Sequence, residues 1–120
     1  MLESLSTFES SAVAQEMTER LLEQHPDLGG LYVAGGGISG VLAALRATGR
    51  AGTLVVVGYE LMANVKTALI DGAMTLFIAH PLERLAAEAI RGMVAAVASK
   101  GDNASHTRIV PFEIFTRENL

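Results

Sequence analysis

The chain contains no cysteine and no tryptophan, and only 3 of its 120 residues are proline. The absence of cysteine excludes a disulfide framework and any metal site built from thiolates. No apolar run approaches the roughly 18 residues that a membrane-spanning helix needs, so no membrane partner is expected. The first ten residues include Glu3 and Glu9 but no lysine or arginine, so we do not expect them to act as a signal peptide.

Positive charge is also scarce, because 9 lysines and arginines stand against 13 acidic residues and give a net charge of −4. No basic stripe is present, so these residues are not expected to grip nucleic acid themselves. The chain is nevertheless 50% hydrophobic and only 18% charged. This composition suggests burial against a second lobe or a second copy, and we expect a homodimer.

Apolar runs alternate with helical periodicities along the whole chain. The order predicts an α/β fold with three αβα layers, a mostly parallel sheet and helices on both faces, within one domain over residues 1–120. Pro111 places the last strand at an edge, and residues 100–106 form a polar loop. The predicted strands cover residues 4–7, 30–34, 53–58, 74–79 and 108–116, and the predicted helices cover 8–24, 39–49, 64–72 and 81–99.

Two of these helices carry clear signals. In the first, Val13, Met17 and Leu21 recur at helical spacing, Ser10 is a candidate N-cap, and Pro26 ends the helix near residue 24. The last begins at Pro81 and has a wide apolar stripe that should face the core. The stripe consists of Leu82, Leu85, Ala86, Ala89, Ile90, Met93, Val94 and Val97.

Candidate ligand residues stand directly after the predicted strands, where an open parallel sheet holds its ligands. They are small or polar, and none is a lysine or arginine, which suits a neutral ligand rich in hydroxyl groups better than a phosphate. The set consists of Ser4, Ser6, Thr7, Gly35, Ser39, Tyr59, Glu60 and His80. With no nucleophile elbow, metal-ligand cluster or Walker lysine, we expect neither an enzyme nor a bound cofactor.

Each of these residues also has a purely structural explanation. The run Gly35 to Gly37 is equally explained as a sharp strand-to-helix turn, and Ser39 as a helix N-cap. Glu60 is equally explained as a cap of the next helix or as a residue in solvent. Tyr59 is better explained as a packing residue, and His80 slightly better as a hydrogen-bonded turn residue. The hypothesis of a site depends on all of them falling at one edge of the sheet.

The stretch "VAGGGISG" contains the pattern G-x-G-x-x-G at Gly35, Gly37 and Gly40, and Glu60 follows 20 residues later. This is the outline of a dinucleotide-binding turn. A long helix precedes the strand, however, and too few residues follow for a second nucleotide-binding half. A small dinucleotide enzyme is therefore the least favoured of the hypotheses.

Taken together, several stretches resemble the C-terminal lobe of the periplasmic-binding-protein type I superfamily, above all LacI-type transcriptional regulators. They are "LLEQHPDLGGLYVAGGG", "SGVLAALRATG", "VVVGYE", "ALIDGAMTLFIAHP" and "VPFEIFTRENL". The resemblance implies one lobe of a two-lobed sugar receptor, with Gly35, Glu60 and His80 standing where the family has an Asn, an Asp and a Gln that contact sugar. Because the turn here is rich in glycine, the polar contact is expected slightly later, at Ser39.

The resemblance implies a regulator that senses a sugar or a related small polar ligand and changes its binding to operator DNA. It further implies that this chain is a C-terminal fragment in the cytoplasm, since the DNA-binding domain through which operator DNA would be held is absent from residues 1–120. The alternative is a periplasmic sugar-binding receptor of an ABC transporter, which would have the same fold and cleft.

Overall fold

The computed structural model describes residues 1–59, 63–99 and 107–120. They form two compact units, one of residues Met1–Ile78 with Ile114–Leu120, and one of residues Ala79–Glu113. The helices are α1 (Ser11–Gln24), α2 (Ile38–Ala47), α3 (Ala63–Ile70) and α4 (Leu82–Ala98). The strands are β1 (Gly30–Val33), β2 (Val55–Tyr59), β3 (Leu76–Ala79) and β4 (Glu113–Phe115).

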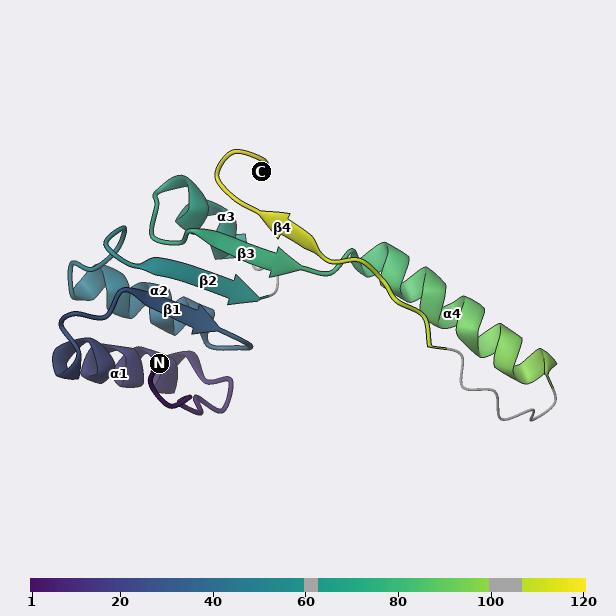
Figure 1. Ribbon diagram of the computed structural model, residues 1–120, viewed down its shortest axis with the longest axis horizontal. Coiled ribbons are helices and arrows are strands. Elements are labelled where there is room, and N and C mark those ends of the chain that lie inside the picture. The colour runs from purple at the N-terminus through teal and green to yellow at the C-terminus, as the bar shows by residue number, and fades with distance from the viewer. Residues whose placement is uncertain (60–62, 100–106) are drawn as a thin grey trace. The chain divides into compact units, whose positions relative to one another are not determined.

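The strands form a sheet in the order β1-β2-β3-β4 (Figure 1). β1 is parallel to β2, with Gly30 opposite Val55, and β2 is parallel to β3, with Val57 opposite Leu76. The arrow of β4 points against that of β3, and the ring of Phe115 stacks on that of Phe77 with centroids 5.0 Å apart. The α/β class, the mostly parallel sheet and the edge position of the last strand are thus confirmed.

One face of this sheet carries the core of the first unit. Val56, Gly58 and Phe77 are buried on it, and a Cβ atom at Gly58 would lie 2.5 Å from Ile38 Cδ1 of α2. Figure 1 shows α1, α2 and α3 on this side. Because successive residues of a strand alternate between faces, the opposite face carries Tyr32 and Val55, which are 63% and 56% exposed.

α1 packs directly against α2. Ser10 caps α1, because its hydroxyl accepts a hydrogen bond from the Val13 N–H at 3.4 Å, as the sequence predicts. At the crossing, a Cβ atom on Gly40 would lie 1.8 Å from the carbonyl oxygen of Ser11, so only glycine fits. Ala14 is fully buried beside this contact. The third glycine of the G-x-G-x-x-G pattern therefore serves helix-to-helix packing.

Two arginines, Arg46 and Arg50, bond to the loops at the amino-terminal edge of the sheet. Arg50 donates to the carbonyl oxygens of Pro26 at 3.2 Å and Leu28 at 3.1 Å. Arg46 in the last turn of α2 pairs with Asp71 at 2.8 Å, and the other oxygen of Asp71 accepts from the Ala73 N–H at 3.0 Å. These bonds hold the loops before β1 and β3 to α2 and its following turn.

The predicted first strand, residues 4–7, is not a strand in the structure. These residues are described as an irregular segment, and the sheet begins with β1. A strand needs a hydrogen-bonded neighbour, and local sequence cannot guarantee one.

α4, which the structure describes throughout, has no buried residue, contrary to the prediction that its apolar stripe lies in the core. Leu82, Met93 and Val97 are 73%, 67% and 82% exposed. Among the described residues of this unit, the ion pairs of α4 lie on its polar side, where Glu88 pairs with Arg91 of the same helix and, at 2.7 Å, with Arg108. The Arg108 hydrogen bond is the main cause that lowers the pKa of Glu88. Among the described residues of the second unit, no buried residue of α4 marks a second apolar layer over the stripe.

We expect the Gly40→Ala substitution to destabilise the first unit by about 3 kcal/mol, because overpacking costs of order 1–3 kcal/mol and the clashing atom is rigid backbone. Gly92→Ala in α4 is the matched control, since a Cβ there has no neighbour within 4 Å. Alanine is the better helix former, so this control should be neutral or slightly stabilising. Urea unfolding followed by circular dichroism measures both, and equal midpoints would contradict the packing role of Gly40.

The Asp71 turn should make stability depend on pH. Its pKa lies below the usual value of 3.8, first because of the hydrogen bond from the Ala73 N–H and then because of Arg46. A lowered pKa means that the charged form stabilises the fold, so this contribution is present above pH 3.8 and is lost as the pH falls further. In urea unfolding, wild type should lose more stability on acidification than Asp71→Asn does. Parallel losses would refute the assignment.

Candidate functional site

Three of the predicted ligand residues lie at the carboxyl edge of the sheet in the first unit. Gly35 begins the turn after β1, Ser39 lies in the first turn of α2, and Tyr59 is the last residue of β2. β1 and β2 are neighbours, with Val33 opposite Gly58, so these positions share one edge. Ser39 and Tyr59 are half-buried. Their role in binding a ligand stays a prediction.

Two more of the predicted residues, Glu60 and His80, are not placed at this edge by the structure. Glu60 lies outside the described residues. His80 belongs to the second unit, where it is exposed. Both keep their predicted roles.

The glycine turn is shaped by its contacts with the N-terminal segment. A Cβ atom on Gly36 would lie 2.8 Å from Glu9 Cβ, and one on Gly37 would lie 2.9 Å from Ala14 Cβ. Gly37 has a φ of 89°, which favours glycine, and it forms the N-cap of α2. The explanation of Ser39 as the N-cap is therefore wrong, because the turn ends two residues earlier than the sequence suggests.

Sequence reasoning missed two residues at this edge, Phe8 and Glu9. Both have positive φ angles, 51° and 57°, which non-glycine residues rarely adopt and which are enriched at functional sites. The Phe8 ring is 84% exposed, and a Cβ on Gly35 would lie 3.8 Å from the Glu9 carboxylate. The sequence predicted a helix over both residues, so no local signal distinguished them. Their proximity to the glycine turn follows only from the packing of α1.

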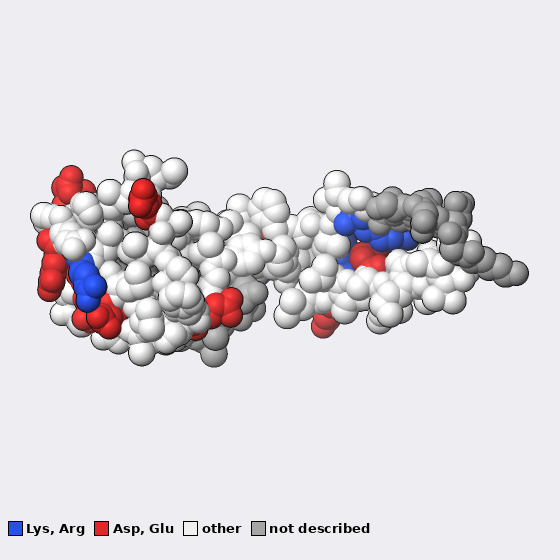
Figure 2. Space-filling model, turned by 90° about the horizontal axis from the view of Figure 1, so that it is seen from below, with Lys and Arg blue, Asp and Glu red and all other residues white. Residues whose placement is uncertain are grey.

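The charges at this edge disfavour a phosphate. Glu9 places a carboxylate beside the turn, and residues 4–9, 30–41 and 55–59 contain no lysine or arginine. On the face seen in Figure 2, basic side chains form only small separate groups. A pyrophosphate in the turn would be repelled by Glu9, whereas hydroxyl groups could donate to it. The dinucleotide hypothesis is accordingly disfavoured.

Other kinds of site find no support in the part of the chain that the structure describes. Among those residues, no group of three or more His, Asp or Glu side chains could hold a metal ion. None of the helices described is long and apolar enough to cross a membrane.

In open α/β sheets, ligands are held outside the carboxyl ends of the strands, and the carboxyl edge described above is polar. The family model for the periplasmic binding protein domain matches residues 2–101, and the chain belongs to this family. No protein with a curated description matches it in sequence.

Several solved structures share this fold, and three of them are sugar- or solute-binding proteins. GanP, a glucose-galactose binding protein from Geobacillus stearothermophilus, shares 16% identity at a TM-score of 0.82, covering 96% of this chain and 41% of that chain. An ABC transporter solute binding protein from Agrobacterium vitis with bound D-fucose shares 18% identity at 0.84, covering 98% and 40%. A sugar-binding protein of a sugar ABC transporter from Bacillus halodurans shares 18% at 0.79, covering 94% and 43%.

This chain therefore spans about two fifths of the length of these proteins. At these identities the likeness shows the fold, and it confirms the predicted lobe of a type I periplasmic binding protein. The narrower prediction of a LacI-type regulator is not confirmed, because the proteins named above are transporter receptors or sugar-binding proteins.

If the positive φ at Glu9 stores strain, relieving it should stabilise the fold. Asparagine tolerates the left-handed region better than glutamate, so Glu9→Asn should raise the free energy of unfolding by about 0.5–1 kcal/mol, since such strain costs of order 1–3 kcal/mol. Glu3→Asn, an exposed position without a positive φ, should change it little. Chemical unfolding measures both variants, and a destabilised Glu9→Asn would show that the glutamate side chain itself supports the fold.

Proposed function

We propose that this chain is one lobe of a sugar receptor and that the carboxyl edge of its sheet forms one wall of the sugar-binding cleft. The observation that carries the proposal is the family match over residues 2–101, together with a strand edge that holds a carboxylate and no basic side chain. Solved neighbours of the same fold contain bound D-fucose and D-allose, which supports a sugar as the ligand class.

The residues at this edge suit the two kinds of surface that a sugar presents. Glu9 can accept hydrogen bonds from sugar hydroxyls, and the Ser39 hydroxyl can donate or accept. The exposed Phe8 ring offers an apolar surface for the C–H face of a sugar ring. Glu60 and His80 belong to the proposal as the further acceptor and the further polar contact that the sequence predicts.

Of the two sugar-sensing hypotheses, a receptor that serves an ABC transporter is now favoured over the regulator. The solved neighbours include several ABC transporter binding proteins and support this choice. The regulator hypothesis retains only the sequence resemblance, and with it remain, as predictions, the homodimer, the cytoplasmic location and the operator DNA. The prediction that the chain is not an enzyme is consistent with a family of binding proteins.

The proposal is tested by titrating ¹⁵N-labelled chain with D-glucose, D-galactose, D-fucose and D-allose separately and recording amide chemical shifts. One lobe offers one wall of a cleft, so we expect a dissociation constant of about 1 mM or weaker, which corresponds to about −4 kcal/mol. The shifts should concentrate at residues 35–39 and at Tyr59. Because binding is expected to be weak, the titration extends to the solubility limit of each sugar. An absence of chemical-shift changes at this edge at that concentration would overturn the proposal.

Two variants distinguish specific sugar binding at this edge from nonspecific contact with the sugar. Glu9→Gln removes the charge but keeps the shape, and it should weaken binding about threefold to tenfold, because hydrogen bonds to charged groups exceed neutral ones. Glu16→Gln on the exposed side of α1 is the matched control and should leave binding unchanged. Equal effects of the two substitutions would assign the loss to net charge and exclude Glu9 from the site.

A further inference from the structure

The apolar stripe of α4 lies open to solvent in the structure, although its pattern is that of a packed helix face. The helix presents a broad band of apolar residues at helical spacing over its 17 residues. The large members of the band are between 40% and 82% exposed. They are Leu82, Leu85, Ile90, Met93, Val94 and Val97. Exposed apolar patches of this kind usually mark sites of interaction with another molecule.

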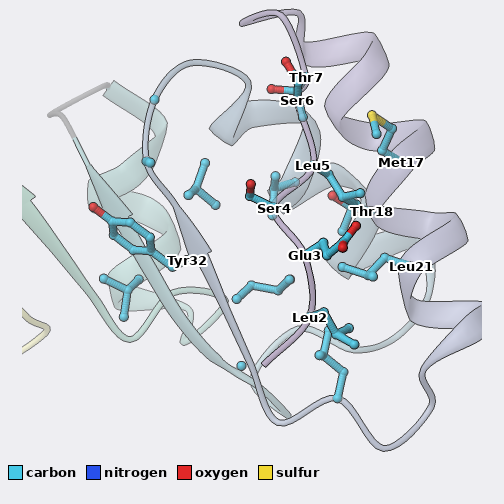
Figure 3. A pocket seen from close by; sticks show the side chains of 18 of the residues that line it. Leu2, Glu3, Ser4, Leu5, Ser6, Thr7, Met17, Thr18, Leu21 and Tyr32 are labelled. Carbon is cyan, nitrogen blue, oxygen red and sulfur yellow. The ribbon is translucent and has the colours of Figure 1, made fainter.

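No described part of the chain buries this stripe. In the first unit, the N-terminal segment partly covers α1, since Figure 3 shows Leu5 between α1 and β1, beside Met17 and Leu21, which are half-buried. On α4, the Arg108 side chain bonds to Glu88 at 2.7 Å, on the side of the helix away from the stripe. The stripe is therefore left for a partner other than the described residues of its own chain.

The inner part of the stripe is complementary to a second copy of itself that runs in the opposite direction. An antiparallel pair of α4 helices centred between Ala89 and Ile90 places Ala89 of each copy level with Ile90 of the other. One turn further out, Ala86 is level with Met93. A small side chain therefore meets a large one in both layers, which lets the helices approach and their side chains interdigitate.

The outer part of the stripe extends the same match to both ends of the helix. Leu85 is level with Val94, and Leu82 is level with Val97, so apolar side chains meet in the outer layers as well. Each of these contacts occurs twice, because a two-fold axis through the centre relates the two helices and the same patch serves both copies. The stripe is thus self-complementary over its whole length, as an interface between identical chains requires.

A parallel pair of α4 helices fits less well. It would place every residue level with its own counterpart, so Ala86 and Ala89 would each face alanine and leave space, whereas Met93 would face Met93. Glu88 and Arg91 would each lie level with a like charge. In the antiparallel register, Glu88 lies level with Arg91 of the other copy, and the helix dipoles run in opposite directions. The steric and the charge patterns both select the antiparallel pair.

We propose that α4 is a dimerisation helix, which pairs through its apolar stripe with α4 of a second copy of this chain in the antiparallel direction. The proposal assigns a surface to the homodimer that the composition suggests. It also accounts for the position of the ion pairs of α4, which lie on the polar side of the helix and leave the apolar stripe free. The inference does not depend on sugar binding, and its tests need no sugar.

Cysteine cross-linking tests the register directly, because the chain has no cysteine of its own. The thiol introduced by Ala89→Cys lies near the two-fold axis, so air oxidation should link two chains into a dimer on a non-reducing gel. Leu82→Cys alone should not cross-link, because its two copies lie about 22 Å apart along the pair, beyond the reach of a disulfide. A mixture of Leu82→Cys and Val97→Cys chains should cross-link. Failure of Ala89→Cys to cross-link, or self-cross-linking of Leu82→Cys, would overturn the proposal.

Sedimentation equilibrium of the full chain measures the affinity of the pair. Met93→Glu places a charge in the stripe, so it should raise the dissociation constant of the dimer at least about tenfold. Ala95→Glu adds the same charge on the opposite, exposed side of the helix and should stay within about threefold of wild type. A wild-type chain that remains monomeric up to about 1 mM would overturn the proposal and leave the stripe to a different partner. A dimer that Met93→Glu leaves intact would assign dimerisation to another surface and would overturn it as well.

Discussion

The close approach of α1 to α2 at Gly40 is the contact on which the rest of the first unit depends. No side chain fits between this residue and the backbone of Ser11, so the backbones of the two helices are in direct contact here. This contact positions the start of α1. The residues just before α1, among them Glu9, therefore lie against the glycine turn after β1. The glycine pattern that resembles a nucleotide-binding motif is thus explained by packing against the chain's own N-terminal segment.

The same contact determines the chemistry of the candidate site. Because α1 begins above the turn, the carboxylate of Glu9 comes to lie beside Gly35, and the Phe8 ring remains exposed. The backbone of both residues is held in a conformation that has an energetic cost, and surrounding structure must maintain it. A carboxylate in this position would accept hydrogen bonds from hydroxyl groups and would repel a phosphate.

The structure also carries apolar surface that its own described elements do not cover. It includes the open side of β1, the sheet face with Tyr32 and Val55, and, in the second unit, the stripe of α4. Apolar surface of this extent usually marks an interaction with further polypeptide. The solved structures GanP and the D-fucose-bound solute binding protein, which share the fold, are more than twice as long as this chain.

Apart from residues 4–7, the sequence by itself determined the order and type of the elements, and it also determined the Ser10 cap, the end of α1 before Pro26 and the edge position of the last strand. These features follow from local periodicity, capping and proline geometry, which act within a few residues. It also indicated the correct sheet edge for Gly35, Ser39 and Tyr59, because parallel strands align their carboxyl ends. Only the tertiary structure decided that residues 4–7 lack a strand partner, that Gly37 and not Ser39 caps α2, and that Glu9 lies beside Gly35. Periodicity records which face of an element is apolar, whereas the identity of its neighbour depends on contacts between residues far apart in the chain.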